Sequence, residues 1–193
     1  MYPEDISKEE VAQLPKLTFG GEIVVIQTQE ELSHWLPILI EDKILGFDTE
    51  TKPNFKKGEF NGIALLQISS NELALLIRIK ELGLPNYLIK LLEDPTILKV
   101  GAAIRDDIKA LQKIRKFNPG GFIDLQSVVP EYGISSLSVR KLSSIVLGHK
   151  VSKTQQLSNW ESPSLTDAQK QYAAIDAWAC REIYIKLITS KAK

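Results

Sequence analysis

The chain has 193 residues, of which 44% are hydrophobic and 25% are charged, and its formal net charge is zero. This length and composition are typical of one globular domain with a buried core, and they exclude an intrinsically disordered chain. Because the charge is balanced, no overall field attracts the chain to polyanions, so a contact with nucleic acid would need a local basic patch.

The N-terminal sequence and the single cysteine indicate where we expect the protein to work. Residues 1–17 carry charges throughout and lack the apolar run of a signal peptide. Cys180 is the one cysteine, which excludes an intramolecular disulfide and suits a reducing compartment. Its helical context predicts a small buried side chain. No apolar run approaches the roughly 20 residues that span a bilayer. We therefore expect a cytoplasmic protein that does not contact membranes.

The expected elements alternate between strands and helices. A polar N-terminal arm is expected at residues 1–20, and residues 21–193 are expected to form a single domain. In chain order, apolar periodicity and turn signals predict a strand at 21–28, a helix at 29–42, a strand at 43–50, a loop at 51–62, strands at 63–69 and 72–78, a helix at 85–93, a strand at 97–102, a helix at 105–117, a strand passing into a helix at 121–129, a helix at 137–148, and a last helix from Thr166 to about Ser190.

Local signals mark several of these boundaries. A tight turn at Ser70-Asn71 predicts a hairpin between its flanking strands. Gly148 is placed to close a helix, and Thr166 with Gln169 fits a capping box. The order of elements predicts an α/β fold whose mixed β-sheet is antiparallel early in the chain and parallel later. A ribonuclease-H-like sheet flanked by helices is compatible with this order, although periodicity alone does not select it.

Four carboxylates stand where an apolar residue would be expected, at three separated points of the chain. Asp48 and Glu50 end the strand at 43–50, and because they are two residues apart they point to the same side. Asp107 and Asp176 lie in helical segments. Lone acids on apolar surfaces are costly unless they are paired or bind a cation. Taken alone, the strand pair could simply be a strand that ends in a polar turn.

Helix phase separates Asp107 from its neighbour Asp106. Asp107 lies three residues after Ile104 and four before Leu111, so it belongs to the apolar stripe of its helix. Asp106 is rotated toward Lys113. The alternative is that both acids only place negative charge in the first turn, where the helix dipole favours it. We expect Asp107 to face inward, and a contribution of Asp106 stays open.

Asp176 lies within the apolar seam of the last helix, and Tyr172 precedes it by one turn on the same face. A tyrosine hydroxyl could satisfy a half-buried carboxylate and do nothing more. The combination favours a functional site, because three separate elements each present an acid inward.

Clustered oxygen ligands without cysteine or histidine partners suit hard cations such as Mg²⁺ or Mn²⁺. Two such cations about 4 Å apart can stabilise the attacking and the leaving oxygen of a phosphoryl displacement. The pattern therefore predicts phosphodiester hydrolysis. Tyr172 could orient the attacking water, since a hydroxyl with a pKa near about 10 is a better positioning group than a base.

One segment is suggestive of substrate contacts. Residues 133–159 contain no acid. This segment contains Arg140, Lys141, Lys150 and Lys153, and Lys56 and Lys57 in the loop after Glu50 could add to it. We take Lys150 and Lys153 as candidate phosphate contacts, with a solvated basic face as the alternative. Trp160 is a candidate for stacking on a base, although a buried core tryptophan is at least as plausible.

Taken together, the acidic motifs resemble those of the DEDD 3′–5′ exonucleases, specifically the tyrosine-containing (DEDDy) subgroup. FDTET matches the first motif of that family, VGAAIRDDIKAL the second and YAAIDAWACREIY the third. The SNW element at 158–160 adds specificity. Within the family the chain is most similar to exonuclease domains of the Werner type and their bacterial relatives, and less similar to ribonuclease D. The resemblance covers roughly residues 21–190.

The resemblance implies a role for each acid. Asp48 would bridge two divalent cations, Mg²⁺ or Mn²⁺. Glu50 and Asp176 would hold the cation that activates water, and Asp107 would support the second cation through water. Tyr172 would orient the nucleophile.

The tyrosine assignment depends on one further position. The histidine subgroup places a histidine five residues before the last aspartate, and this chain has Gln171 there. The implied activity is release of nucleoside monophosphates from the 3′ end of single-stranded or 3′-ended nucleic acid, DNA or RNA, without a small-molecule cofactor. The alternatives are a catalytically silent nucleic-acid-binding domain of the same fold, or a phosphatase or nuclease of another polarity.

Overall fold

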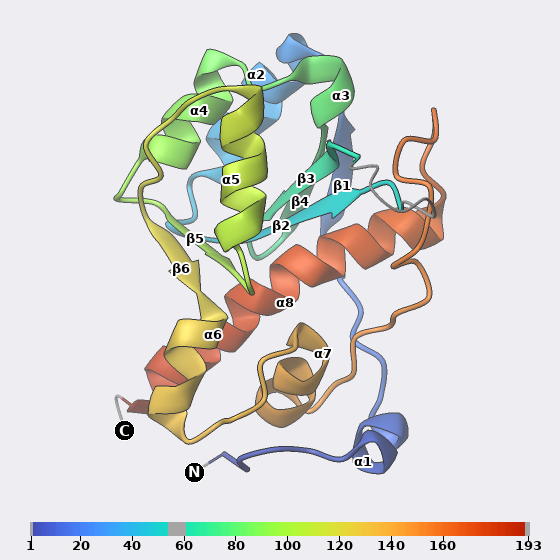
Figure 1. Cartoon of the computed structure of the whole chain (residues 1–193), viewed down its shortest axis with the longest axis vertical. Coiled ribbons are helices and arrows are strands. Elements are labelled where there is room, and N and C mark those ends of the chain that lie inside the picture. The colour runs from blue at the N-terminus through green and yellow to red at the C-terminus, as the bar shows by residue number, and fades with distance from the viewer. Residues whose placement is uncertain (1, 54–60, 192–193) are drawn as a thin grey trace.

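The structure is a computed structural model that describes residues 2–53 and 61–191 (Figure 1). Lys56 and Lys57, which were considered as substrate contacts, lie outside the described residues. The strands are β1 (Glu22–Ile26), β2 (Ile44–Thr51), β3 (Ile63–Ser69), β4 (Leu73–Arg78), β5 (Leu98–Gly101) and β6 (Phe122–Asp124). The helices are α1 (Lys8–Gln13), α2 (Gln29–Leu39), α3 (Ile79–Leu82), α4 (Asn86–Glu93), α5 (Arg105–Ile114), α6 (Leu125–Val128), α7 (Val139–Leu142) and α8 (Asp167–Lys191), with a 3₁₀ turn η1 (Val129–Tyr132) and a π-helical turn η2 (Ser143–Leu147).

The six strands form one mixed sheet in the order β1-β4-β3-β2-β5-β6. The pairs β2–β3 and β3–β4 are antiparallel, whereas β1–β4, β2–β5 and β5–β6 are parallel. The predicted hairpin is confirmed, and its turn is closed by the amide of Ser70, which donates to the carbonyl of Leu73 at 2.8 Å. The expectation of an antiparallel start and parallel crossovers later is therefore confirmed.

Helices cover both faces of the sheet (Figure 1). The helices α2, α4 and α5 pack on one face, where their buried leucines join Leu45 and Phe47 of β2 in the largest apolar cluster. The long helix α8 crosses the other face, and α7 and η2 pack against its C-terminal half. This three-layer arrangement confirms the expected α/β class with a mixed sheet flanked by helices.

The backbone of α8 lies directly on β2. A Cβ atom placed on Gly46 would come within 1.9 Å of the carbonyl oxygen of Ala177. Ala173 and Ala177, one turn apart and therefore on the same face of the helix, are small and buried. The absence of a side chain at Gly46 is what allows this approach, and it places the residue before Ala177, Asp176, close to the strand.

Helix boundaries follow the local signals with two differences. The capping box of α8 is confirmed: the Gln169 side chain accepts from the Thr166 amide at 2.9 Å, and the Thr166 hydroxyl accepts from the Gln169 amide at 3.2 Å. Gly148 ends η2 with a φ of +72°, as its position predicted, but the helix before it is short and passes into the π-helical turn. Helix α5 stops three residues earlier than expected, and Ile114 at its end is 45% exposed.

The N-terminal arm is docked on the domain and contains a helix that the sequence did not predict. Its helix α1 begins at a capping box formed by Ser7 and Glu10. Backbone hydrogen bonds join Ser135 to Glu4 at 2.8 Å and Leu17 to Lys150 at 2.9 Å. The arm therefore packs along the segment that leads from η1 to the end of η2.

The described residues also bear on the predictions made from composition. Cys180 on α8 is buried, as expected, and burial raises the pKa of its thiol. Within residues 2–53 and 61–191, no helix combines the length and the apolar character needed to cross a membrane.

We expect Gly46→Ala to destabilise the protein, because the new methyl group would collide with the backbone of α8. Overpacking of this kind costs about 1–3 kcal/mol or more in free energy of unfolding, which urea denaturation measures. Gly20→Ala is the matched control, since a Cβ there meets nothing within 4 Å, and it should change stability by less than about 0.5 kcal/mol. Equal stability of the two variants would contradict this account of the α8 contact.

Candidate active site

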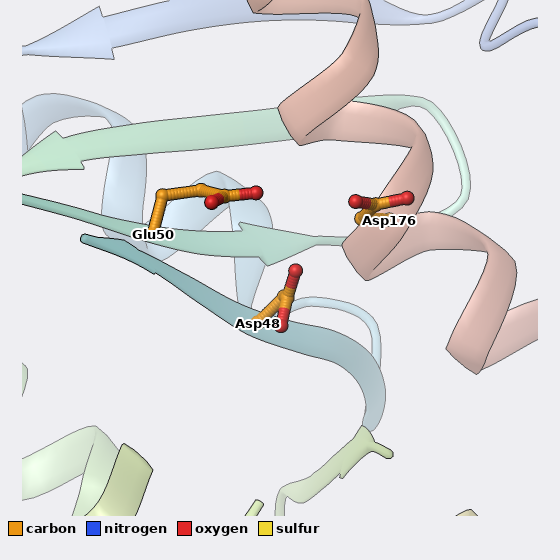
Figure 2. A group of neighbouring side chains, drawn as sticks. All are labelled: Asp48, Glu50 and Asp176. Atoms are coloured by element: carbon orange, nitrogen blue, oxygen red, sulfur yellow. The ribbon is translucent and has the colours of Figure 1, made fainter. Parts of the chain in front are cut away.

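Three of the predicted acids form one cluster. Asp48 and Glu50 of β2 and Asp176 of α8 each offer a carboxylate oxygen, and these oxygens lie within 4.8 Å of one another. Figure 2 shows the three carboxylates converging between the strand and the helix. All three side chains are half-buried. Residues 48, 50 and 176 are thus brought together, as the sequence predicted.

Strand geometry explains why β2 supplies two of these ligands. Alternate side chains on a strand share a face, so Gly46, Asp48 and Glu50 all point toward α8. Gly46 lets the helix backbone approach, and the two acids follow it along the strand. The same alternation that packs the helix therefore positions the cluster.

Asp107 reaches the site from the other side of β2. Thr49 points to the face opposite Asp48 and Glu50, and its hydroxyl donates a hydrogen bond to the Asp107 carboxylate. Asp107 is half-buried, whereas the side chain of Asp106 is 93% exposed and pairs with Lys109 at 3.3 Å. The helix-phase argument for Asp107 is confirmed. Asp107 lies outside the 4.8 Å group, so a role as a cation ligand stays a prediction.

Burial raises the pKa of each clustered carboxyl, and repulsion by neighbouring carboxylates adds to this for Asp48 and Glu50. Burial, followed by the negative charges of Asp176 and Asp107, raises the pKa of Glu50 to about 8. Burial raises the pKa of Asp176 to about 7. Burial and the charges of Asp176 and Glu50 also raise the pKa of Asp48. A bound divalent cation favours the ionised forms, so this donor set of carboxylate oxygens fits a hard cation.

Tyr172 lies one turn before Asp176 on α8, as predicted, and lines the same cavity as that carboxylate. Burial and the charge of Asp176 raise the pKa of the phenol, so Tyr172 stays protonated. Its ring packs on Trp160, with ring centroids 5.8 Å apart. At the position where a histidine was considered, Gln171 instead donates to the carbonyl of Phe19 at 3.1 Å.

The candidate substrate residues lie in different environments. Lys153 lines a cavity of about 200 Å³ that also contains Asp48, Tyr172 and Asp176. The side chain of Lys150 donates instead to the Ala12 carbonyl and so ties down the N-terminal arm.

The prediction for Trp160 needs correction. Its side chain is completely buried, and it packs with Leu65, Leu76 and Ala173 under Tyr172. Because no part of the ring is exposed, Trp160 cannot stack on a base in this structure. Its place in the core supports the ring of Tyr172 from behind, which is the buried alternative that the sequence left open.

One polar residue near the cluster was missed. Gln67 pairs with Asp48 across the β2–β3 ladder, and directly opposed residues of an antiparallel pair share a face. Gln67 is fully buried, and neither its amide nitrogen nor its amide oxygen has a hydrogen-bond partner among the described residues. The signal was present in the sequence, because Gln67 interrupts an otherwise apolar strand before Ser69.

The raised pKa values predict how stability depends on pH. Between about pH 4 and pH 8, the folded chain binds more protons at Glu50 and Asp176 than the unfolded chain does. Without a divalent cation, the free energy of unfolding contributed by these groups therefore falls as pH rises through this window, and the loss is complete above it. Addition of Mg²⁺ or Mn²⁺ should raise the melting temperature more at pH 8 than at pH 5.

The double variant Glu50→Gln/Asp176→Asn is the control for this dependence. Neutral amides carry no titration, so the fall in melting temperature between pH 5 and pH 8 should be smaller than in the parent chain. The response to Mn²⁺ should also be lost. An unchanged slope with pH in the double variant would show that these carboxyls are not its source.

Comparison with known proteins relates this geometry to a family. A family model described as 3′–5′ exonuclease matches residues 23–190. The bifunctional 3′–5′ exonuclease/ATP-dependent helicase WRN of Mus musculus is 33% identical over 184 residues, which cover 90% of this chain and 13% of that protein. Exonuclease 3′–5′ domain-containing protein 2 of Drosophila melanogaster is 32% identical over 173 residues, covering 85% of this chain and 29% of the relative. The chain thus spans less than a third of either relative.

Solved structures show the same fold. The Aedes aegypti Nibbler EXO domain superposes with a TM-score of 0.80 at 24% identity, covering 91% of this chain and 93% of that one. Escherichia coli RNase D gives a TM-score of 0.78 at 22% identity, covering 89% and 45%. Both neighbours share the arrangement of strands and helices that carries the acidic cluster. Because the 3′–5′ exonuclease model matches residues 23–190, which is nearly the whole chain, the chain belongs to the 3′–5′ exonuclease family.

Proposed function

We propose that this chain is a 3′–5′ exonuclease that hydrolyses phosphodiester bonds from the 3′ end of a nucleic-acid strand and releases nucleoside monophosphates. The observation that carries the proposal is the convergence of carboxylate oxygens of Asp48, Glu50 and Asp176 within 4.8 Å of one another, with Tyr172 lining the same cavity as Asp48 and Asp176. Membership of the 3′–5′ exonuclease family supports the polarity.

Two divalent cations, Mg²⁺ or Mn²⁺, are part of the proposal. Such a pair would stabilise the attacking and leaving oxygens of the displacement. The donor set supports hard cations, because it consists of carboxylates. Asp48 would contribute to both cations, Glu50 and Asp176 would hold the cation that activates water, and Asp107 would support the second cation. A crystal structure of the EXD2 exonuclease domain soaked in Mn, 28% identical with a TM-score of 0.53, is consistent with this choice.

Tyr172 acts as a positioning group in this proposal. Because its pKa is raised, the phenol keeps its proton and can donate a hydrogen bond. Such a donor beside Asp176 can orient the attacking water for in-line attack. To act as a general base, the phenol would first have to lose its own proton. Trp160 behind the ring limits the orientations that Tyr172 adopts.

The substrate in this proposal is a strand with a free 3′ end, and the setting is cytoplasmic. Relatives named as exonucleases support a nucleic-acid substrate. The structure of RNase D is described as that of an exoribonuclease involved in structured RNA processing, so RNA belongs in the test beside DNA.

A 5′-labelled panel of single-stranded DNA, recessed duplex DNA and RNA tests the activity and its direction. With Mg²⁺ or Mn²⁺, we expect a ladder that shortens from the 3′ end, and chelation should stop it. Asp48→Asn and Asp176→Asn should each lower kcat by about 100-fold or more, because they remove charge from the cation site.

Two results would contradict this proposal. Retention of full metal-dependent activity by both variants would show that the cluster is not the site. Binding of the oligonucleotides without cleavage under all conditions would instead support a catalytically silent binding domain.

The pair Asp107→Asn and Asp106→Asn tests the assignment in the second motif. Asp107 is half-buried and hydrogen-bonded to Thr49, so its variant should lose about 10- to 100-fold in kcat. Asp106 is exposed, and its variant should stay within about twofold of the parent, since loss of a surface ion pair matters little. The reverse order of the two activities would overturn the assignment.

A further inference from the structure

A basic cavity adjoins the acidic site. The cavity that contains Asp48, Tyr172 and Asp176 is also lined by Ser138, Arg140 and Lys153. A second cavity, of about 110 Å³, is lined by Lys8, Val11, Ser138, Arg140, Lys141 and Lys153. Because Ser138, Arg140 and Lys153 belong to both, the two cavities form one groove that leads from the carboxylates to a group of cations.

The charge of this groove changes from one end to the other. Among the residues that the structure describes, no acid lines the second cavity. Lys141 is neutralised by Asp5, whose carboxylate accepts from its ammonium group at 2.6 Å. Among the described residues, none forms an ion pair with Lys8, Arg140 or Lys153. These cations leave an uncompensated positive charge next to the site.

Arg140 carries the strongest sign of a missing ligand. Its Nε is buried and has no hydrogen-bond partner within residues 2–53 and 61–191. A buried donor without an acceptor is costly, and a guanidinium is suited to a phosphate oxygen. Arg140 lies at the junction of the two cavities, where an anion would satisfy it.

The N-terminal arm supplies one wall of the groove. Lys8 and Val11 belong to α1, and α1 is held in place by hydrogen bonds on both sides. Asp5 before the helix binds Lys141, and the Ala12 carbonyl near its end accepts from Lys150. Lys8 is therefore presented to the groove by a docked segment.

We propose that this groove binds a phosphate of the substrate strand upstream, on the 5′ side, of the bond that is cleaved, with Arg140, Lys153 and Lys8 as its contacts. The proposal rests on the exonuclease activity proposed above. The terminal nucleotide at a free 3′ end carries no phosphate beyond the scissile one, so a further phosphate can only belong to the upstream strand. The acids then act on the scissile phosphate while the cations hold the next part of the backbone.

The test compares a substrate that has the upstream phosphates with one that lacks them. Thymidine 5′-(4-nitrophenyl phosphate) contains a single phosphodiester, whereas a single-stranded oligonucleotide contains many. For Arg140→Gln and Lys8→Ala, the ratio of oligonucleotide to ester kcat/KM should fall about tenfold. Arg140→Lys, which keeps the positive charge, should recover part of the lost ratio. Lys90→Ala is the control, since Lys90 is exposed on α4 across the sheet.

Two further measurements test the phosphate contacts. One is the dependence of kcat/KM on salt, and the other replaces one charged phosphate of the substrate by a neutral group. Each phosphate contact removed should reduce the slope of log kcat/KM against log salt by about 0.7 for a single strand. A methylphosphonate in place of the upstream phosphate that the groove binds should lower the cleavage rate of the parent chain. It should lower the rate of Arg140→Gln little further. Equal losses on ester and oligonucleotide, or an unchanged salt slope, would overturn the subsite.

A binding measurement separates this inference from the activity on which it rests. Fluorescence anisotropy of a labelled oligonucleotide, without divalent cation, should show weaker binding by Lys8→Ala and Arg140→Gln and unchanged binding by Lys90→Ala. If the parent chain cleaves neither substrate but this pattern holds, the activity fails and the subsite stands. If cleavage proceeds and binding is the same in all variants, the subsite is wrong.

Discussion

The contact between the α8 backbone and β2 is the constraint on which the site depends. At Gly46 the strand lacks a side chain, and the Ala177 carbonyl occupies the space that a Cβ would fill. Buried alanines on α8 keep the helix close along this face. Asp176 precedes Ala177, and Asp48 lies two residues after Gly46 on the same face, so the packing that holds the layers together also brings their carboxylates together.

That close packing sets the electrostatics of the cluster. Carboxyls that are buried beside one another resist ionisation, and the pKa values of Glu50 and Asp176 rise to about 8 and about 7. Asp107 adds to the repulsion from across the strand, where Thr49 holds it. The ionised form of this cluster is costly without a bound cation. In the groove beyond it, the buried Nε of Arg140 has no acceptor in the described part of the chain, which is the opposite imbalance.

Much of the fold and of the site could be read from local patterns. Short apolar runs indicated the strands, of which β3 and β4 are buried on both faces, and helical spacing indicated most helices. Helix phase chose Asp107 over Asp106, and the exposed fraction of Asp106 agrees. Trp160 shows the limit of this reasoning: a large aromatic residue near a site can stack on a ligand or fill the core, and only the packing around its ring decides.

The sequence by itself determined the types of residue in the site and their phase on each element, since alternation and helical period are local properties of the backbone. It did not determine the strand order or the docking of the N-terminal arm, because both depend on contacts between segments far apart in the chain. Only the tertiary structure placed Gln67 opposite Asp48 and brought Lys8 to the groove that Arg140 lines. The four acids are local features of three motifs, but the convergence of Asp48, Glu50 and Asp176 is a property of the packed sheet and helix.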